Sequence, residues 1–223
     1  MSRSETAGTT ASVDRGIEAF RRGQPVCIHD AADREGETDL VYPAGAVTPN
    51  AVARLRNDAG GLVCVALSDA VAEAFDLPFR QAAIEHPVAS DHDLAYDDRS
   101  SFSLTVNHRE TRTGITDADR SLTIRSLAEA AATPAAVDFT SRFRAPGHVH
   151  LLRAADGLLA DRQGHTELGI ALADAADIPP AVVVTEMLDD ETGRALSPRD
   201  AADYATRHGI PYIEGAQLVD RLG

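Results

Sequence analysis

Residues 33–39, DREGETD, place four carboxylates and one arginine between two apolar runs. Glu35, Glu37 and Asp39 alternate along this segment, so in an extended loop their side chains would point to one face and could bind a divalent cation together. A solvated turn is the alternative in so acidic a chain. A run of carboxylates beside buried strands is costly, however, unless the charges are paired or coordinate a metal. The spacing therefore predicts a functional site, in which Asp33 has no assigned role.

Two more polar segments, residues 107–116 (NHRETRTGIT) and 162–166 (RQGHT), directly precede sequences typical of helices. The first turn of a helix presents unpaired N–H groups and the positive end of the helix dipole, which favour phosphate. Arg162 would add a guanidinium that can contact a phosphate through two hydrogen bonds. An ordinary capped helix start is the alternative for each segment. Both are candidate phosphate-binding segments.

Three residues on apolar, strand-like runs are candidate acids or bases. Glu186 follows the run VVVT at residues 182–185, where a lone carboxylate would be half-buried with a raised pKa. A strand-end glutamate that reaches solvent is the alternative. His148 and His150 alternate on one strand and therefore share a face, and either could transfer protons near neutral pH. A hydrogen-bonded structural role is the alternative for both histidines.

The chain has no lysine, so all 21 of its lysine-plus-arginine residues are arginine. A Schiff-base lysine, a P-loop lysine and a lysine general base are thereby excluded, and any phosphate must be held by arginine, hydroxyls, backbone N–H groups or a metal. The formal net charge of -14 disfavours nucleic-acid and anionic-membrane partners. A lysine-free, acidic composition also suits concentrated salt. At molar salt the Debye length is ~3 Å, which screens the repulsion among the acidic side chains. We therefore hypothesise that the protein is halophilic.

The two cysteines, Cys27 and Cys64, each lie inside an apolar run, which predicts buried free thiols in a reducing compartment. The N-terminal residues are polar and lack the apolar core of a signal peptide. No apolar run approaches the ~20 residues of a membrane span. These patterns predict a cytoplasmic protein.

Helix and strand patterns alternate after residues 1–12, which we expect to be a disordered tail ahead of a single domain at residues 13–223. Strands are expected over residues 25–29, 40–42, 62–66, 101–106, 147–152, 181–187 and 210–213. Helices are expected from Val13 to near Gly23, after the capping residues Thr48, Ser68, Thr116 and Ser197, and over residues 167–176. Residues 69–99 give no clear pattern beyond the Ser68-capped helix. The alternation predicts an α/β (α+β) domain with a mixed β-sheet flanked by helices.

Several motifs occur in a fixed order along the chain: D-R-E-x-E-x-D at 33–39, T-G-I-T at 113–116 followed by Asp119-Arg120, P-G-H-V at 146–149, R-x-G-H-T-E at 162–167, and a strand that ends in Glu186. In this order they resemble the 3,4-dihydroxy-2-butanone-4-phosphate synthase family of riboflavin biosynthesis. The similarity spans about residues 17–213.

The resemblance implies a magnesium-dependent carbon–carbon lyase. Members of the family have an α/β fold with a mixed sheet and form homodimers with active sites near the interface. They convert D-ribulose 5-phosphate into L-3,4-dihydroxy-2-butanone 4-phosphate and formate. Some relatives carry a fused GTP cyclohydrolase II domain, which we do not expect here because the chain ends at Gly223.

The resemblance also implies roles for single residues. His148 and Glu186 would be the proton-transfer pair, Glu35 and His165 would bind the metal, and Glu37 would line the acidic loop. The sugar phosphate would contact Arg34, Glu35, Asp39, Thr113, Thr116, Arg162, Gln163, Gly164, His165, Thr166 and Glu186. Asn107, Thr185 and Thr38 depart from residues common in the family, although none of them has a chemical role in this assignment.

Mg²⁺ prefers oxygen ligands, so a histidine ligand suggests that Mn²⁺ substitutes well.

Two other functions fit the same residues. A metal-dependent sugar-phosphate isomerase or epimerase would use the same enolisation without losing carbon, and formate detection separates the two. A non-enzymatic acidic protein that only binds cations would not bind ribulose 5-phosphate through Arg162.

Overall fold

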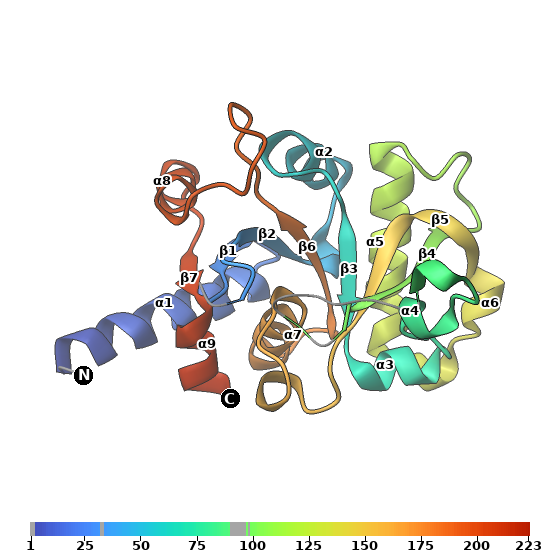
Figure 1. Ribbon diagram of the computed structural model, residues 1–223, viewed down its shortest axis with the longest axis horizontal. Coiled ribbons are helices and arrows are strands. Elements are labelled where there is room, and N and C mark those ends of the chain that lie inside the picture. Colours follow the sequence, from blue (N-terminus) through green and yellow to red (C-terminus); the bar gives the residue numbers. More distant parts are fainter. Residues whose placement is uncertain (1–2, 32–33, 90–96, 98) are drawn as a thin grey trace.

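The computed structural model describes residues 3–31, 34–89, 97 and 99–223 (Figure 1). Its strands are β1 (Val26–His29), β2 (Thr38–Pro43), β3 (Cys64–Leu67), β4 (Phe102–His108), β5 (Phe143–Arg153), β6 (Ala181–Glu186) and β7 (Tyr212–Glu214). Its helices are α1 (Arg3–Arg21), α2 (Pro49–Asp58), α3 (Asp69–Ala74), α4 (Arg80–Ala83), α5 (Asp117–Ala132), α6 (Phe139–Arg142), α7 (His165–Ala175), α8 (Pro198–His208) and α9 (Gly215–Leu222). Short 3-10 turns are η1 (Ala44–Ala46), η2 (Pro87–Ala89), η3 (Pro134–Ala136) and η4 (Leu158–Ala160).

The strands of the described chain form one seven-stranded sheet in the order β4-β5-β3-β6-β2-β1-β7. The sheet is mixed, because β1 pairs with β7 and β3 with β5 in parallel, whereas the other neighbours are antiparallel. Strands distant in sequence thus become neighbours, and β3 lies between β5 and β6. The predicted fold class, an α/β domain with a mixed sheet flanked by helices, is confirmed.

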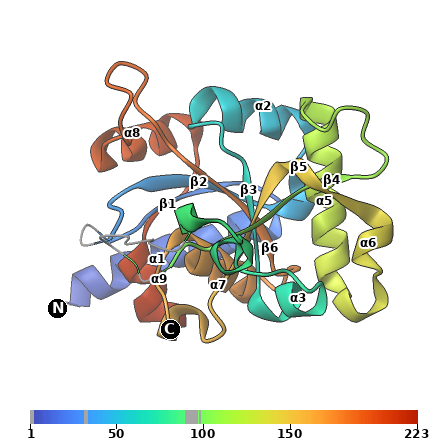
Figure 2. The same ribbon diagram turned by 45° about the vertical axis from the view of Figure 1, so that its right-hand side comes forward.

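Each face of the sheet packs against its own set of helices, so the molecule has three layers. Alternation along β6 shows the division: Ala181 and Val183 join a core with α2, α5 and α8, whereas Val182 and Val184 join a core with α1, α7 and α9. Figure 2 shows α2 and α8 above the sheet and α1, α7 and α9 below it. Side chains that alternate along a strand point to opposite faces, which explains why β6 is apolar throughout.

Local sequence explains where the main helices begin. Thr48, Ser68, Thr116 and Ser197 each accept a hydrogen bond from a backbone N–H in the first turn of the following helix, as predicted. Helix α8 ends at Gly209, whose φ of 65° suits glycine because a side chain there would be strained.

Several boundaries differ from the sequence-based expectation, among them the starts of α1, β5 and α7. Helix α1 begins at Arg3, so the expected division between a disordered tail and a domain at residues 12 and 13 falls inside a helix. Ser12 is buried there, and its hydroxyl donates to Gln217 Oε1 on α9 at 2.8 Å, which anchors this part of α1. Strand β5 begins at Phe143 and not at residue 147. Helix α7 begins at His165 and not at Glu167, because Gly164 occupies the N-cap position.

None of the helices in the described parts of the chain is both long and apolar enough to cross a membrane. Cys27 and Cys64 are free and buried, as predicted. Burial raises the pKa of both thiols to about 12.

Both thiols should resist alkylation in the folded protein. A thiol with a pKa of about 12 is almost entirely protonated at pH 8, and the thiolate is the reactive form. Iodoacetamide at pH 8 should therefore leave the native protein unmodified and add two groups after unfolding in urea, as counted by intact-mass spectrometry. Rapid stoichiometric labelling of the native protein would contradict this expectation.

Candidate active site

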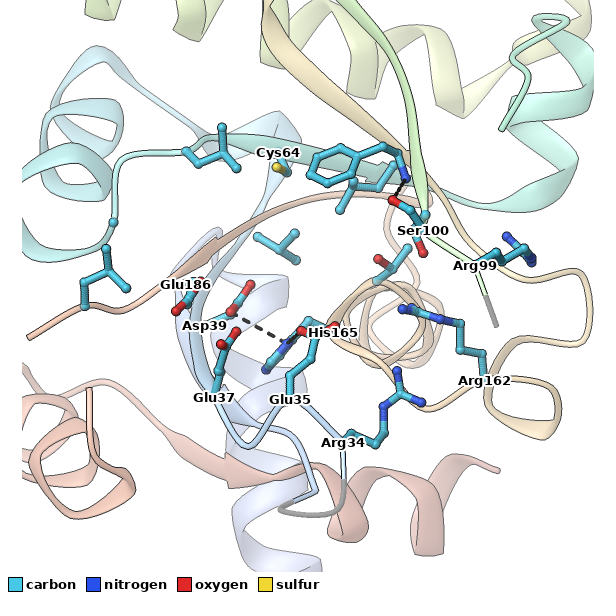
Figure 3. Close-up of a pocket in the computed structure, with 18 residues that line it drawn as sticks. Arg34, Glu35, Glu37, Asp39, Cys64, Arg99, Ser100, Arg162, His165 and Glu186 are labelled. Carbon is cyan, nitrogen blue, oxygen red and sulfur yellow. Dashed lines mark hydrogen bonds and ion pairs between the residues drawn. The ribbon is translucent and has the colours of Figure 1, made fainter. Parts of the chain in front are cut away.

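A cavity of about 550 Å³ opens at the end of the sheet where β2 begins and β6 ends (Figure 3). Its lining includes most of the residues that the sequence singled out, although they come from the acidic loop, β2, β6, the turn before α7 and α7 itself. The predicted residues in the lining are Arg34, Glu35, Glu37, Asp39, Arg162, His165, Thr166 and Glu186. Asp33 lies outside the described residues. The structure thus brings two of the three predicted polar segments, together with Glu186, to one place.

Three carboxylates gather on one side of the cavity. The antiparallel register of β2 and β6 places Asp39 directly opposite Glu186, and Glu37 comes from the loop just before β2. Figure 3 shows the three carboxyl groups close together.

The crowding changes how these groups bind protons. Burial, followed by repulsion from Glu186, Glu35 and Asp39, raises the pKa of Glu37 to about 7. Burial and the neighbouring carboxylates likewise raise the pKa of Asp39 to about 6, although His165 opposes the shift. Burial and Glu35 raise the pKa of Glu186. Carboxyl groups with raised pKa values can both accept and return protons near neutral pH, which is the property of a general acid–base pair.

His165, the first residue of α7, faces the same carboxylates from the other side. Its Nε2 donates to the Ile28 carbonyl at 3.2 Å, which leaves Nδ1 3.8 Å from Glu35 Oε2 and 3.7 Å from Asp39 Oδ1. Burial alone would lower the pKa of His165, but Asp39, Glu35 and Asp30 raise it to about 9. The nearby His165 in turn lowers the pKa of Glu35. A cation bound to His165 would therefore replace the proton on Nδ1.

Asp30, Glu35 and His165 offer ligand atoms that all lie within 4.8 Å of one another. Asp30 is fully buried; its Oδ1 accepts from the Glu37 N–H at 3.0 Å. Its Oδ2 accepts no hydrogen bond from the described residues and lies 3.9 Å from Arg34 Nε. Two carboxylates and an imidazole nitrogen are a ligand set that suits a divalent cation. The buried Asp30 Oδ2, which has no hydrogen-bond donor among the described residues, would be one of the ligand atoms. Glu35 and His165 were the predicted metal ligands, and Asp30 adds a third candidate.

Arg34 and Arg162 lie together on the opposite side of the cavity (Figure 3). Asp97 Oδ2 accepts from both guanidiniums, from Arg34 Nη2 at 3.0 Å and from Arg162 Nε at 2.5 Å. Arg162 Nη1 also donates to Glu167 Oε2 at 2.7 Å. Two guanidiniums that converge on one anionic oxygen form a site suited to an anion such as phosphate.

Gly164 and Thr166 contribute to this side of the cavity, whereas Gln163 points elsewhere. A Cβ at Gly164 would come within 2.5 Å of Arg162 Nη1 and 3.2 Å of Arg34 Nη2, so glycine is needed for the two guanidiniums to lie so close. Thr166 is buried and lines the cavity. Gln163 does not line it; its Nε2 donates to the Leu159 carbonyl at 3.4 Å.

The remaining predicted residues form a second group on another part of the surface. His148 is exposed; its N–H donates to Asn107 Oδ1 at 2.9 Å, and its Nδ1 lies 3.2 Å from Asn107 Nδ2. Thr113 N donates to Asp119 Oδ2 at 3.2 Å, and Thr116 caps α5.

None of the three predicted residues in this second group is among the described residues that line the cavity. His148 lies on β5 and Glu186 on β6, with β3 between those strands. Within one chain, the predicted proton-transfer pair is therefore divided between two places. His150 packs edge-on against Phe102, with 5.9 Å between the ring centroids, and does not line the main cavity either.

Asp30, Asp97 and Glu167 contribute to the site but were assigned no role from the sequence. Asp30 directly follows the β1 run, and a carboxylate at a strand end was an available signal. Glu167 stands inside the R-x-G-H-T-E motif, yet only the fold shows that it is fully buried. Asp97 lies in the segment 69–99, whose pattern was unclear, so no sequence signal singles it out.

Comparison with known proteins identifies relatives along nearly the whole chain. A family model described as 3,4-dihydroxy-2-butanone 4-phosphate synthase matches residues 14–221. The protein of that name from Archaeoglobus fulgidus is 51% identical over 219 residues, which cover 93% of this chain and 92% of the relative. The crystal structure of the Candida albicans synthase has a TM-score of 0.79 and 33% identity, covering 95% of this chain and 97% of that chain. Another solved synthase, described as in complex with two magnesium ions, has a TM-score of 0.78 and 31% identity, covering 92% and 94% of the two chains.

Proposed function

This chain belongs to the 3,4-dihydroxy-2-butanone 4-phosphate synthase family, enzymes of riboflavin biosynthesis, and we propose that it converts D-ribulose 5-phosphate into L-3,4-dihydroxy-2-butanone 4-phosphate and formate. One observation carries the proposal: a single cavity of about 550 Å³ is lined by an arginine pair, by a carboxylate cluster, and by Glu35 and His165 of the candidate cation group. The reaction divides five carbons into four and one, and its atoms balance without a further reactant.

The arginine side of the cavity would bind the phosphate. Arg34 and Arg162 supply guanidinium donors, and the buried N-terminal turn of α7 with Thr166 lies beside them. A dianionic phosphate forms stronger hydrogen bonds with guanidinium than a neutral ligand does. The phosphate would therefore fix one end of the substrate and direct its carbonyl towards the carboxylates.

Asp30, Glu35 and His165 would hold a divalent cation, which we propose to be Mg²⁺, with Mn²⁺ as a substitute because one ligand is a nitrogen. The magnesium complex of the solved relative supports this choice. When bound, the cation supplies Lewis acidity that polarises a substrate carbonyl or hydroxyl.

Glu186, Glu37 and Asp39 would carry out the proton transfers. Enolisation of a 2-ketose requires a base for the proton next to the carbonyl, and the later rearrangement and loss of C4 require that protons be returned. The raised pKa values of these carboxyl groups support both directions of transfer near neutral pH. The positive charges of Arg34, Arg162 and His165 partly balance the carboxylates in the cavity.

A second copy of the chain would complete the site. His148, Thr113 and Thr116 cluster away from the cavity, and Leu62, Ile115 and Leu188 are large apolar side chains exposed near these two regions. We propose a homodimer in which the group around His148 lies against the partner's cavity. This arrangement would reunite His148 with Glu186 across the interface.

Mixed dimers test this arrangement. The His148→Ser and Glu186→Gln homodimers should both be inactive, whereas a heterodimer of the two should recover up to about half of wild-type formate release, because one of its two sites keeps both groups. Two affinity tags allow the heterodimer to be purified. A heterodimer of two differently tagged Glu186→Gln chains is the control. Inactivity of the mixed heterodimer would contradict a shared site.

Formate detection tests the reaction itself. Incubation of the protein with ribulose 5-phosphate and Mg²⁺ should release one equivalent of formate per sugar consumed, as measured with a coupled dehydrogenase. Consumption of the sugar with formation of an isomer but no formate would contradict the proposal.

A further inference from the structure

The Arg162 guanidinium donates to two carboxylates, those of Glu167 and Asp97. Of the two, only Glu167 also accepts a backbone hydrogen bond from the described residues. Glu167 is fully buried, and both of its oxygens are engaged: Oε2 by Arg162 Nη1 at 2.7 Å and Oε1 by the Ala155 N–H at 3.0 Å. Because one of these partners is backbone, the carboxylate of Glu167 is fixed relative to the fold. Glu167 therefore acts as a permanent support that orients Arg162.

Asp97 contacts the same guanidinium at Nε, and Arg162 itself lines the cavity. Its Oδ2 accepts from Arg162 Nε at 2.5 Å and from Arg34 Nη2 at 3.0 Å, while its side chain keeps 10% exposure. No backbone N–H among the described residues donates to this carboxylate in the way that Ala155 donates to Glu167. The guanidinium donors thus hold Asp97 in place.

The donors that Asp97 occupies are those a phosphate would need. Bidentate recognition of an oxyanion uses two N–H groups on one side of a guanidinium, and Glu167 already takes Nη1 of Arg162. The Nε side remains, and Asp97 Oδ2 sits there while also reaching Arg34. Arg162 Nε carries a single N–H, so a phosphate oxygen that binds there must compete with Asp97 Oδ2.

We propose that Asp97 is an internal competitor for the phosphate of the substrate, which must displace its carboxylate from Arg34 and Arg162, whereas Glu167 holds Arg162 in both states. The inference rests on the proposed function. A neutral sugar cannot compensate the two guanidiniums when Asp97 leaves, but a phosphate dianion can. Asp97 therefore makes the cavity selective for phosphorylated sugars, because any ligand that displaces it must bring its own negative charge.

The experiment compares four full-length proteins: wild type, Asp97→Asn, Glu167→Gln and Asp203→Asn. The Asp203 side chain is exposed on α8, so its variant controls for the loss of one negative charge. Isothermal titration at constant ionic strength measures the binding of inorganic phosphate and of unphosphorylated D-ribulose. Thermal unfolding verifies that each variant is folded.

Asp97→Asn should bind phosphate about tenfold more tightly than wild type, because a neutral amide competes less well than a carboxylate for two guanidiniums. Its affinity for D-ribulose should not rise by a comparable factor. Glu167→Gln should bind phosphate more weakly, since Arg162 loses its fixed support, and Asp203→Asn should match wild type. Unchanged or weaker phosphate binding by folded Asp97→Asn would overturn the inference.

Failure of this inference can be distinguished from failure of the proposed function. If wild type binds phosphate and releases formate from ribulose 5-phosphate while Asp97→Asn gains no phosphate affinity, only the role of Asp97 is refuted. If wild type neither binds phosphate nor releases formate, both the proposed function and this inference are refuted.

Discussion

Glu186→Gln should abolish formate release from ribulose 5-phosphate, with a loss of at least about a hundredfold in kcat. Glutamine has nearly the same shape and can still form hydrogen bonds, but it cannot accept a proton. Glu186 lies opposite Asp39 in the sheet and lines the cavity, and burial together with Glu35 raises its pKa. The substitution therefore removes a proton-transfer group and leaves the sheet intact.

The same variant should still bind the substrate. Arg34 and Arg162 lie across the cavity from Glu186 and keep their guanidinium donors. Calorimetry with ribulose 5-phosphate measures binding, and thermal unfolding measures stability. Glu191→Gln, in an exposed loop, is the matched control and should be fully active. Full activity of Glu186→Gln would exclude Glu186 from proton transfer.

Glu35→Gln should shift the Mg²⁺ dependence of activity to concentrations at least about tenfold higher, because one anionic ligand is lost. Asp30→Asn should shift it in the same direction, since Asp30 Oδ2 is the orphaned oxygen of the cation group. The protein is first stripped with EDTA and then titrated with metal. Binding of Mn²⁺, followed by electron paramagnetic resonance without substrate, gives a readout that is independent of turnover. An unchanged metal titration in Glu35→Gln would contradict ligation by this residue.

Much of the fold could be predicted because its elements are encoded locally. The caps at Thr48, Ser68, Thr116 and Ser197 and the buried run before Glu186 depend on neighbouring residues, and the structure confirms them. The order of the strands could not be predicted in this way. The pairing of Asp39 with Glu186 depends on β2 lying beside β6, a contact between distant parts of the chain.

The site could be predicted where the charge itself was unusual for its position. Glu35, Asp39 and Glu186 stand beside buried strands, and the structure brings them to one cavity. Asp97 could not be found, because its role depends on contacts with Arg34 and Arg162, which are distant from it in the sequence. Function in concentrated salt, inferred from the lysine-free acidic composition, stays a prediction.

The most direct test of the central claim follows one carbon atom. Ribulose 5-phosphate labelled with ¹³C at C4 is incubated with the protein and Mg²⁺, and the products are observed by NMR. The proposed function predicts that the label appears in formate and that the four-carbon phosphate product is unlabelled. A label that stays in a five-carbon sugar phosphate would contradict carbon–carbon cleavage and leave only isomerisation or binding.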